Sequence, residues 1–204
     1  MLLRIALASV IAVVVAASGA SAHGPLCGPS KAHTLASDAL ARVYSRGGKV
    51  YGCAKGSHSS YFLGSTSPSA TRERARVGPI ALAGVDVAFG RTTSGVDVIS
   101  AEVVVRNLTD GRVLRDDAAT AGNFGPETAQ RVDSIVVKPD GSVAWIASVN
   151  SIISHRGTTQ VRKSDQTRRA SLDSGRKIKP NSLRLDGSKL SWSDGLVMKT
   201  ATLR

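Results

Sequence analysis

The side chains capable of acid–base or nucleophilic catalysis are few and widely spaced along this chain of 204 residues. It has four histidines, His23, His33, His58 and His155. The G-x-S-x-G motif of a nucleophile elbow and the H-E-x-x-H motif of a zinc-binding helix do not occur. A Ser-His-Asp triad assembles in space, so it would have to use His58 or His155, which lie in polar, loop-like segments. The sequence therefore indicates no catalytic residue and favours a non-enzymatic protein, with a small secreted hydrolase of unrecognised active site as the alternative.

Metal-ligating residues do not cluster in the sequence either. Zinc sites use Cys and His at short, regular spacing, and neither His33 nor His58 falls at such a spacing from the two cysteines. Asp116 and Asp117 are the nearest approach to an acidic calcium loop, and a solvated turn is the simpler interpretation of this pair. We therefore predict no metal site and no cofactor.

Basic residues are the most informative charged feature. The chain has 27 Lys and Arg against 15 Asp and Glu, a net charge of +12 at pH 7, and residues 156–189 hold ten basic residues and three acids. The simpler interpretation is that this charge keeps a secreted protein soluble, because the basic residues are scattered and form no continuous run. The alternative is a surface that attracts polyanions, with an anionic polymer or a protein at the cell exterior as its partner. The candidate basic patch would then consist of Arg162, Lys163, Arg168 and Arg169.

The aromatic content argues against specific nucleic-acid binding. Proteins that bind single strands combine basic grooves with aromatic stacking platforms, and the chain has 2 Trp, 3 Tyr and 3 Phe. The same scarcity argues against a carbohydrate-binding face.

The N-terminus has the pattern of a secretory signal. Arg4 precedes an apolar stretch over residues 5–15, which has the length of a signal h-region and is shorter than the roughly 20 residues of a membrane span. The Ala-Ser-Ala triplet at residues 20–22 fits the A-x-A cleavage rule. We predict a signal peptide over residues 1–22, cleavage before His23, a secreted protein and no transmembrane segment in the mature chain. An uncleaved N-terminal anchor is the alternative.

The chain has two cysteines, Cys27 and Cys53. In an oxidising compartment, two lone thiols are most simply read as one disulfide. Export therefore predicts a Cys27–Cys53 bridge, with two free thiols as the alternative.

The elements that must position these residues are strands. Short runs of Val, Ile, Leu and Thr alternate with Gly, Asp-Gly and Pro-Asp-Gly steps, a pattern typical of an all-β protein with tight hairpins. Four of these hairpins have an aromatic residue near the middle of the second strand, namely Tyr51, Phe89, Trp145 and Trp192. The spacing of these aromatics is similar to the roughly 40–50 residues of a four-stranded propeller blade. Their equivalent positions predict that Trp145 and Trp192 lie in the core.

The hairpin at residues 138–148, in which a Pro-Asp-Gly turn leads into an apolar strand with Trp145, resembles the repeat of TolB-type β-propellers. Residues 185–193 match the same repeat without the proline. The overall layout also resembles uncharacterised secreted actinobacterial proteins that carry such blade-like units. In the propeller family this motif is structural, so the resemblance implies turn and core residues and no catalytic residue.

The repeats and the resemblance imply one all-β domain over residues 23–204 that is β-propeller-like. About four blade-like antiparallel meanders are expected, near residues 34–65, 80–116, 132–173 and 182–204. An open stack of β-meanders and a β-sandwich are the alternatives. The last unit would have one strand fewer than a full blade, which His33-Thr34-Leu35 could supply in a closed ring. These features together predict a secreted, non-enzymatic binding or scaffold protein.

Overall fold

The computed structural model describes residues 27–68, 70–71, 75–122, 124, 127–154 and 156–204. Within these residues the chain forms strands, turns and bends, with no helix. The all-β prediction is confirmed. The predicted signal peptide and its cleavage site before His23 lie outside the described residues.

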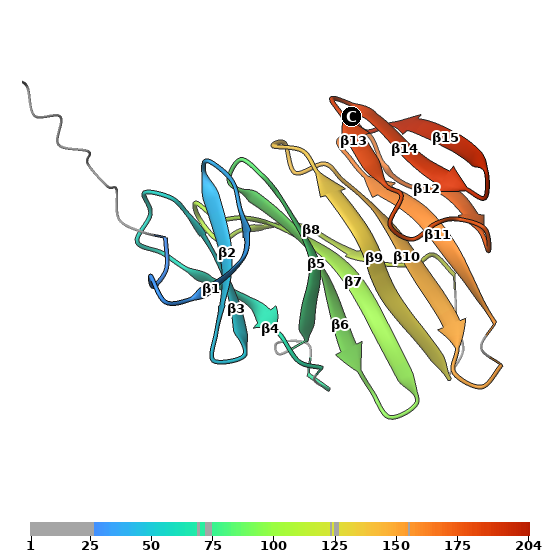
Figure 1. The fold of residues 1–204 in the computed structure, drawn as a ribbon, viewed down its shortest axis with the longest axis horizontal. Coiled ribbons are helices and arrows are strands. Elements are labelled where there is room, and N and C mark those ends of the chain that lie inside the picture. The colour runs from blue at the N-terminus through green and yellow to red at the C-terminus, as the bar shows by residue number, and fades with distance from the viewer. Residues whose placement is uncertain (1–26, 69, 72–74, 123, 125–126, 155) are drawn as a thin grey trace, which may run out of the picture.

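The described strands follow one another as four antiparallel groups, which we call the first to fourth meanders (Figure 1). The first contains β1 (His33–Ser37), β2 (Ala41–Arg46), β3 (Lys49–Ala54) and β4 (Tyr61–Ser65). The second contains β5 (Arg76–Ala83), β6 (Asp86–Ser94), β7 (Val98–Asn107) and β8 (Val113–Ala118). The third contains β9 (Thr128–Val137), β10 (Val143–Ser151), β11 (Gly157–Ser164) and β12 (Arg169–Gly175). The fourth contains β13 (Arg184–Asp186), β14 (Lys189–Asp194) and β15 (Val197–Thr202).

Hydrogen bonds join the first three meanders into one sheet of 12 strands. Two short parallel contacts make the connections, one between β4 and β5 and one between the beginnings of β7 and β9. The rest of β7 pairs with β8 along the same edge. The fourth meander is a separate sheet of three strands.

The core lies between successive meanders because their apolar faces pack against one another. Side chains alternate between the two faces of a strand, so each central meander can bury both faces. One apolar cluster joins β2–β4 to β5–β7, a second joins β5–β8 to β9 and β10, and a third joins β10 and β11 to the fourth meander. The result is a stack of meanders that runs from the first at one end to the fourth at the other (Figure 1).

A closed propeller is not confirmed. Closure by the N-terminal segment would require pairing between β1 and the last meander, whereas β1 pairs with β2 and β15 pairs with β14. These strands lie at opposite ends of the molecule (Figure 1). The first meander also exposes two cations, Arg46 and Lys49, on its outer side. The described strands therefore form the open stack that was the alternative, with three strands in the last unit as expected.

Two predicted packing features are confirmed. Trp145 and Trp192 are 1% and 2% exposed, and the indole N–H of Trp145 donates to the Ala119 carbonyl at 2.6 Å. The disulfide joins Cys27 to Cys53 with their Cα atoms 5.7 Å apart. This bridge fastens the segment before β1 to the end of β3.

Candidate anion-binding site

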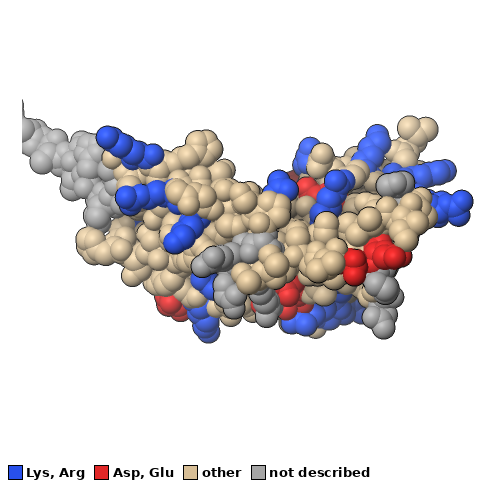
Figure 2. Space-filling model, turned by 90° about the horizontal axis from the view of Figure 1, so that it is seen from below, with Lys and Arg blue, Asp and Glu red and all other residues tan. Residues whose placement is uncertain are grey.

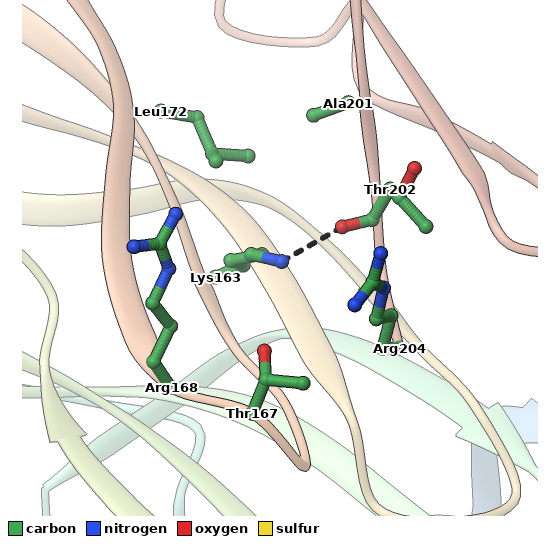
Figure 3. Close-up of a pocket in the computed structure, with 7 residues that line it drawn as sticks. All are labelled: Lys163, Thr167, Arg168, Leu172, Ala201, Thr202 and Arg204. Carbon is green, nitrogen blue, oxygen red and sulfur yellow. Dashed lines mark hydrogen bonds between the residues drawn. The ribbon is translucent and has the colours of Figure 1, made fainter.

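A cavity of about 450 Å³ lies between the β11–β12 hairpin and the end of β15 with the residues that follow it (Figure 3). We call it the anion cavity. Its lining residues come from two segments that are far apart in the sequence, and they are Lys163, Thr167, Arg168, Leu172, Ala201, Thr202 and Arg204. The apolar cluster between the third and fourth meanders holds these two segments beside each other.

The carboxylate of Asp165 connects the two segments that line the cavity. Its Oδ1 accepts hydrogen bonds from the Thr167 hydroxyl at 2.6 Å and from the Thr167 and Arg168 N–H groups at 2.9 and 3.1 Å. Its Oδ2 accepts from Lys163 Nζ at 2.6 Å and from the Arg204 N–H at 3.0 Å. A single buried carboxylate thus fixes the hairpin turn and the end of the described chain.

Lys163 forms the floor of the anion cavity. The side chain is buried, and its ammonium group also donates to the Thr202 carbonyl at 2.8 Å. Burial by itself raises the pKa of Asp165, but the hydrogen bonds from Lys163, Thr167 and Arg204 outweigh that effect and hold the pKa far below its usual range. Asp165 therefore remains ionised, and the Lys163 ammonium is paired with it.

The exposed guanidinium groups of Arg168 and Arg204 lie on either side of the Lys163 ammonium (Figure 3). Leu172 and Ala201 form an apolar wall above these cations. With Asp165 as the buried counter-charge of Lys163, the two guanidinium groups are the cations left to face a ligand. A planar guanidinium suits bidentate contact with a carboxylate, phosphate or sulfate. The geometry can hold one such group, with the attached carbon atoms against the apolar wall.

The four basic residues of the candidate patch do not lie together in the structure. Lys163 and Arg168 line the anion cavity, whereas Arg162 and Arg169 lie on the other face of the third meander. Arg162 stacks over the Trp145 ring at 5.5 Å from its centroid and donates to the Ala118 carbonyl at 2.6 Å. Arg169 pairs with the buried carboxylate of Asp117 at 2.5 Å.

This separation has a simple cause, because consecutive residues of a strand point to opposite faces of the sheet. Arg162 is opposite Trp145 in the pairing with β10, and Lys163 is opposite Ala144. Basic residues that are neighbours in the sequence, such as Arg162 and Lys163, therefore cannot form one surface patch. Asp117 also differs from the predicted solvated turn, since it lies in β8 and is 4% exposed.

Arg204 and Thr202 are among the cavity residues that the sequence did not indicate. They lie 39 residues from Asp165 and Lys163, respectively. The sequence contains no local pattern that links them to the β11–β12 hairpin. Their contribution follows from the packing of the fourth meander on the third.

Basic residues do not form one continuous surface on the face shown in Figure 2. Lys and Arg occur there in separate groups divided by uncharged surface. The anion cavity is a candidate for anion recognition that needs no extended basic face.

The residues that the hydrolase alternative would use are not brought into a catalytic arrangement in the described part of the chain. His58 is exposed, and no hydrogen bond joins it to a described carboxylate. His155 lies outside the described residues. Among the residues that the structure describes, no group of three or more His, Cys, Asp and Glu is placed to hold a metal ion, and no helix has the length and apolar character needed to cross a bilayer.

We found no match to this chain among models of known protein families, curated proteins or solved structures.

Proposed function

We propose that the protein is an exported, non-enzymatic binding or scaffold protein that holds an anionic group of a partner at the cell exterior. The observation that carries the proposal is the pair of exposed guanidinium groups, Arg168 and Arg204, on either side of buried Lys163. Asp165 accepts hydrogen bonds from the Lys163 ammonium and from the main-chain N–H groups of Arg168 and Arg204, so the backbone that carries the two arginines is fixed before a ligand arrives. Preorganisation of this kind reduces the entropy cost of binding.

Two features support export. The pattern of residues 1–22 is that of a signal peptide. The Cys27–Cys53 disulfide suits an oxidising compartment. In this proposal the four blade-like meanders, propeller-like in their repeat and open at both ends, serve as the scaffold.

The proposal can be tested by isothermal titration calorimetry with a glycerol-phosphate hexamer, which carries anionic groups but no sugar ring. The R168A/R204A variant should bind about 100-fold more weakly than the wild type, because a hydrogen bond to a charged group contributes about 1.5–3 kcal/mol. Binding to the wild type should also weaken as salt increases.

A matched control removes two exposed basic residues elsewhere. Arg112 is in the β7–β8 turn and Lys179 precedes β13, and neither lines the anion cavity. The R112A/K179A variant has the same net charge as R168A/R204A and should bind almost as well as the wild type. Equal losses in the two variants would mean that only overall charge matters, which would contradict a specific site.

A further inference from the structure

Three aromatic side chains form a row across the outer face of the first meander. Tyr44 on β2 is directly opposite Tyr51 on β3, and Tyr51 is directly opposite Phe62 on β4. The Tyr44 and Tyr51 rings are stacked, with centroids 5.6 Å apart and planes at 22°. The Phe62 ring is tilted at 59° against Tyr51, at a centroid distance of 5.7 Å. This aromatic row places a half-exposed Tyr51 between two supporting rings.

The base of the aromatic row is held firmly. Tyr44 is 5% exposed and packs in one cluster with Cys27 and Cys53. Its hydroxyl donates to the Ser60 hydroxyl oxygen at 3.1 Å, and the Arg42 guanidinium lies over its ring at 5.4 Å from the centroid. Tyr51 therefore rests on a fixed support, and the exposed part of its ring lines a cavity with little loss of side-chain freedom.

Two cationic side chains, Arg46 and Lys49, lie beside the aromatic row. Arg46 follows Tyr44 by two residues and Lys49 precedes Tyr51 by two, so the alternation of strand side chains places them on the same face. They are opposite each other where β2 and β3 meet the hairpin turn. Both side chains are exposed, and no ion pair joins either one to an acid in the described part of the chain.

Two members of the aromatic row and the two cations line a cavity of about 440 Å³, whose lining includes Tyr44, Tyr51, Arg46, Lys49 and Ser60. The turn between the cations is Gly47-Gly48, with φ of 56° and 73°. Glycine tolerates this left-handed conformation and adds no side chain, so the cavity stays open at the turn.

We propose that this cavity binds an acidic saccharide, a sugar ring that bears a carboxylate or sulfate. The apolar C–H face of the sugar would pack against the exposed part of the Tyr51 ring. The acidic substituent would then reach Arg46 and Lys49, and Ser60 would offer a hydroxyl to the ring oxygens.

A single platform distinguishes this site from a groove for single-stranded nucleic acid. Such a groove follows the backbone with several successive stacking platforms, whereas Tyr44 is buried beneath Tyr51 in the aromatic row. The inference does not depend on the anion cavity, because the two sites lie at opposite ends of the stack (Figure 1).

The test uses the full chain in an R168A/R204A background, which removes the anion cavity as a second binding place. Calorimetric titration with a galacturonate hexamer, and with its neutral methyl ester, separates ring stacking from charge recognition. The background protein should bind the acidic oligomer better than the ester. Adding R46A/K49A should reduce binding of the acidic oligomer to the level of the ester and leave binding of the ester unchanged.

Tyr51 is tested with two substitutions that preserve bulk. Y51F retains a flat ring and should bind as the background protein does, whereas Y51L should weaken both oligomers by about tenfold or more. Circular dichroism and thermal melting establish that each variant is folded. Unchanged binding by Y51L would overturn the proposal, as would tighter, Tyr51-dependent binding of a single-stranded oligonucleotide.

Discussion

Lys163 and Asp165 form a buried ion pair at the floor of the anion cavity, with Nζ and Oδ2 2.6 Å apart and side chains 9% and 0% exposed. The two residues belong to one hairpin, yet the same carboxylate also accepts the Arg204 N–H. The pair therefore connects the third meander to the chain that follows the fourth. The same bonds that shape the cavity also fasten the end of the stack.

Replacing Asp165 should cost a large part of the protein's stability. D165N leaves the Lys163 ammonium buried without its counter-charge, and breaking a buried pair in this way costs about 3–5 kcal/mol. The free energy of unfolding can be measured by urea denaturation. D97N changes an exposed acid in the β6–β7 turn and should alter stability by less than about 0.5 kcal/mol. A loss of less than about 1 kcal/mol in D165N would contradict the structural role of the pair.

The same carboxylate predicts how stability depends on pH. The pKa of Asp165 is far lower in the folded protein than the value of about 3.9 expected for an unfolded chain. Its contribution is therefore fully present above about pH 5 and declines as the pH falls through the unfolded value towards the folded one. Urea midpoints should fall more steeply between pH 5 and pH 3 in the wild type than in D165N. Parallel declines in both proteins would assign the acid sensitivity to other groups.

The hairpins could be predicted because turn chemistry is local. Gly141 has a φ of +74° and Asp140 Oδ1 accepts a hydrogen bond from the Ser142 N–H at 2.9 Å, as the Pro-Asp-Gly sequence suggests. Trp145 could be placed in the core because its position repeats. The first inference uses residues only a few positions apart, and the second uses the recurrence of an aromatic residue in successive hairpins.

The relations between meanders could not be predicted in the same way. Arg204 reaches the anion cavity only because the fourth meander packs on the third. The count of aromatic residues argued against a stacking face, yet it contained no information that Tyr44, Tyr51 and Phe62 are neighbours in one row. Ring closure likewise depends on whether the two end faces match, which composition does not reveal.

Truncating the side chain of Trp145 tests the predicted core. Trp145 fills the interface between the second and third meanders, and W145A should lose about 3–5 kcal/mol because the cavity it leaves can collapse only in part. V113A, at a valine that is 44% exposed, is the control and should change little. Denaturant unfolding followed by far-ultraviolet circular dichroism measures both. A loss below about 1 kcal/mol for W145A would place the residue at the surface.

Removal of the disulfide should destabilise the protein by a moderate amount. The bridge closes a loop with a sequence separation of 26 residues, for which the chain-entropy model gives about 3 kcal/mol. C27S/C53S should therefore unfold at lower urea concentration than the oxidised wild type. Mass spectrometry of the unfolded protein before and after reduction should show a gain of two hydrogen atoms. Equal masses would show that the thiols are free.

Asp173 on β12 gives the last prediction, because it connects the third meander to the fourth. Its Oδ2 accepts hydrogen bonds from the Trp192 indole N–H at 2.8 Å and from Lys199 Nζ at 2.9 Å. Desolvation raises the pKa of Asp173, but these bonds outweigh it and leave the pKa below its usual value. In a stack, each unit is stabilised mainly by its neighbours, so D173A should weaken the fourth meander selectively.

The expected result is faster amide hydrogen exchange in β13–β15, with exchange in β1–β4 unchanged. The cause is the unpaired indole N–H of Trp192, since leaving such a buried donor without a partner costs about 1–3 kcal/mol. D97A, which removes an exposed acid in the second meander, should leave both regions unchanged. If D173A instead accelerates exchange equally in all four meanders, the stack unfolds as one cooperative unit, and the fourth meander has no separate stability for Asp173 to control.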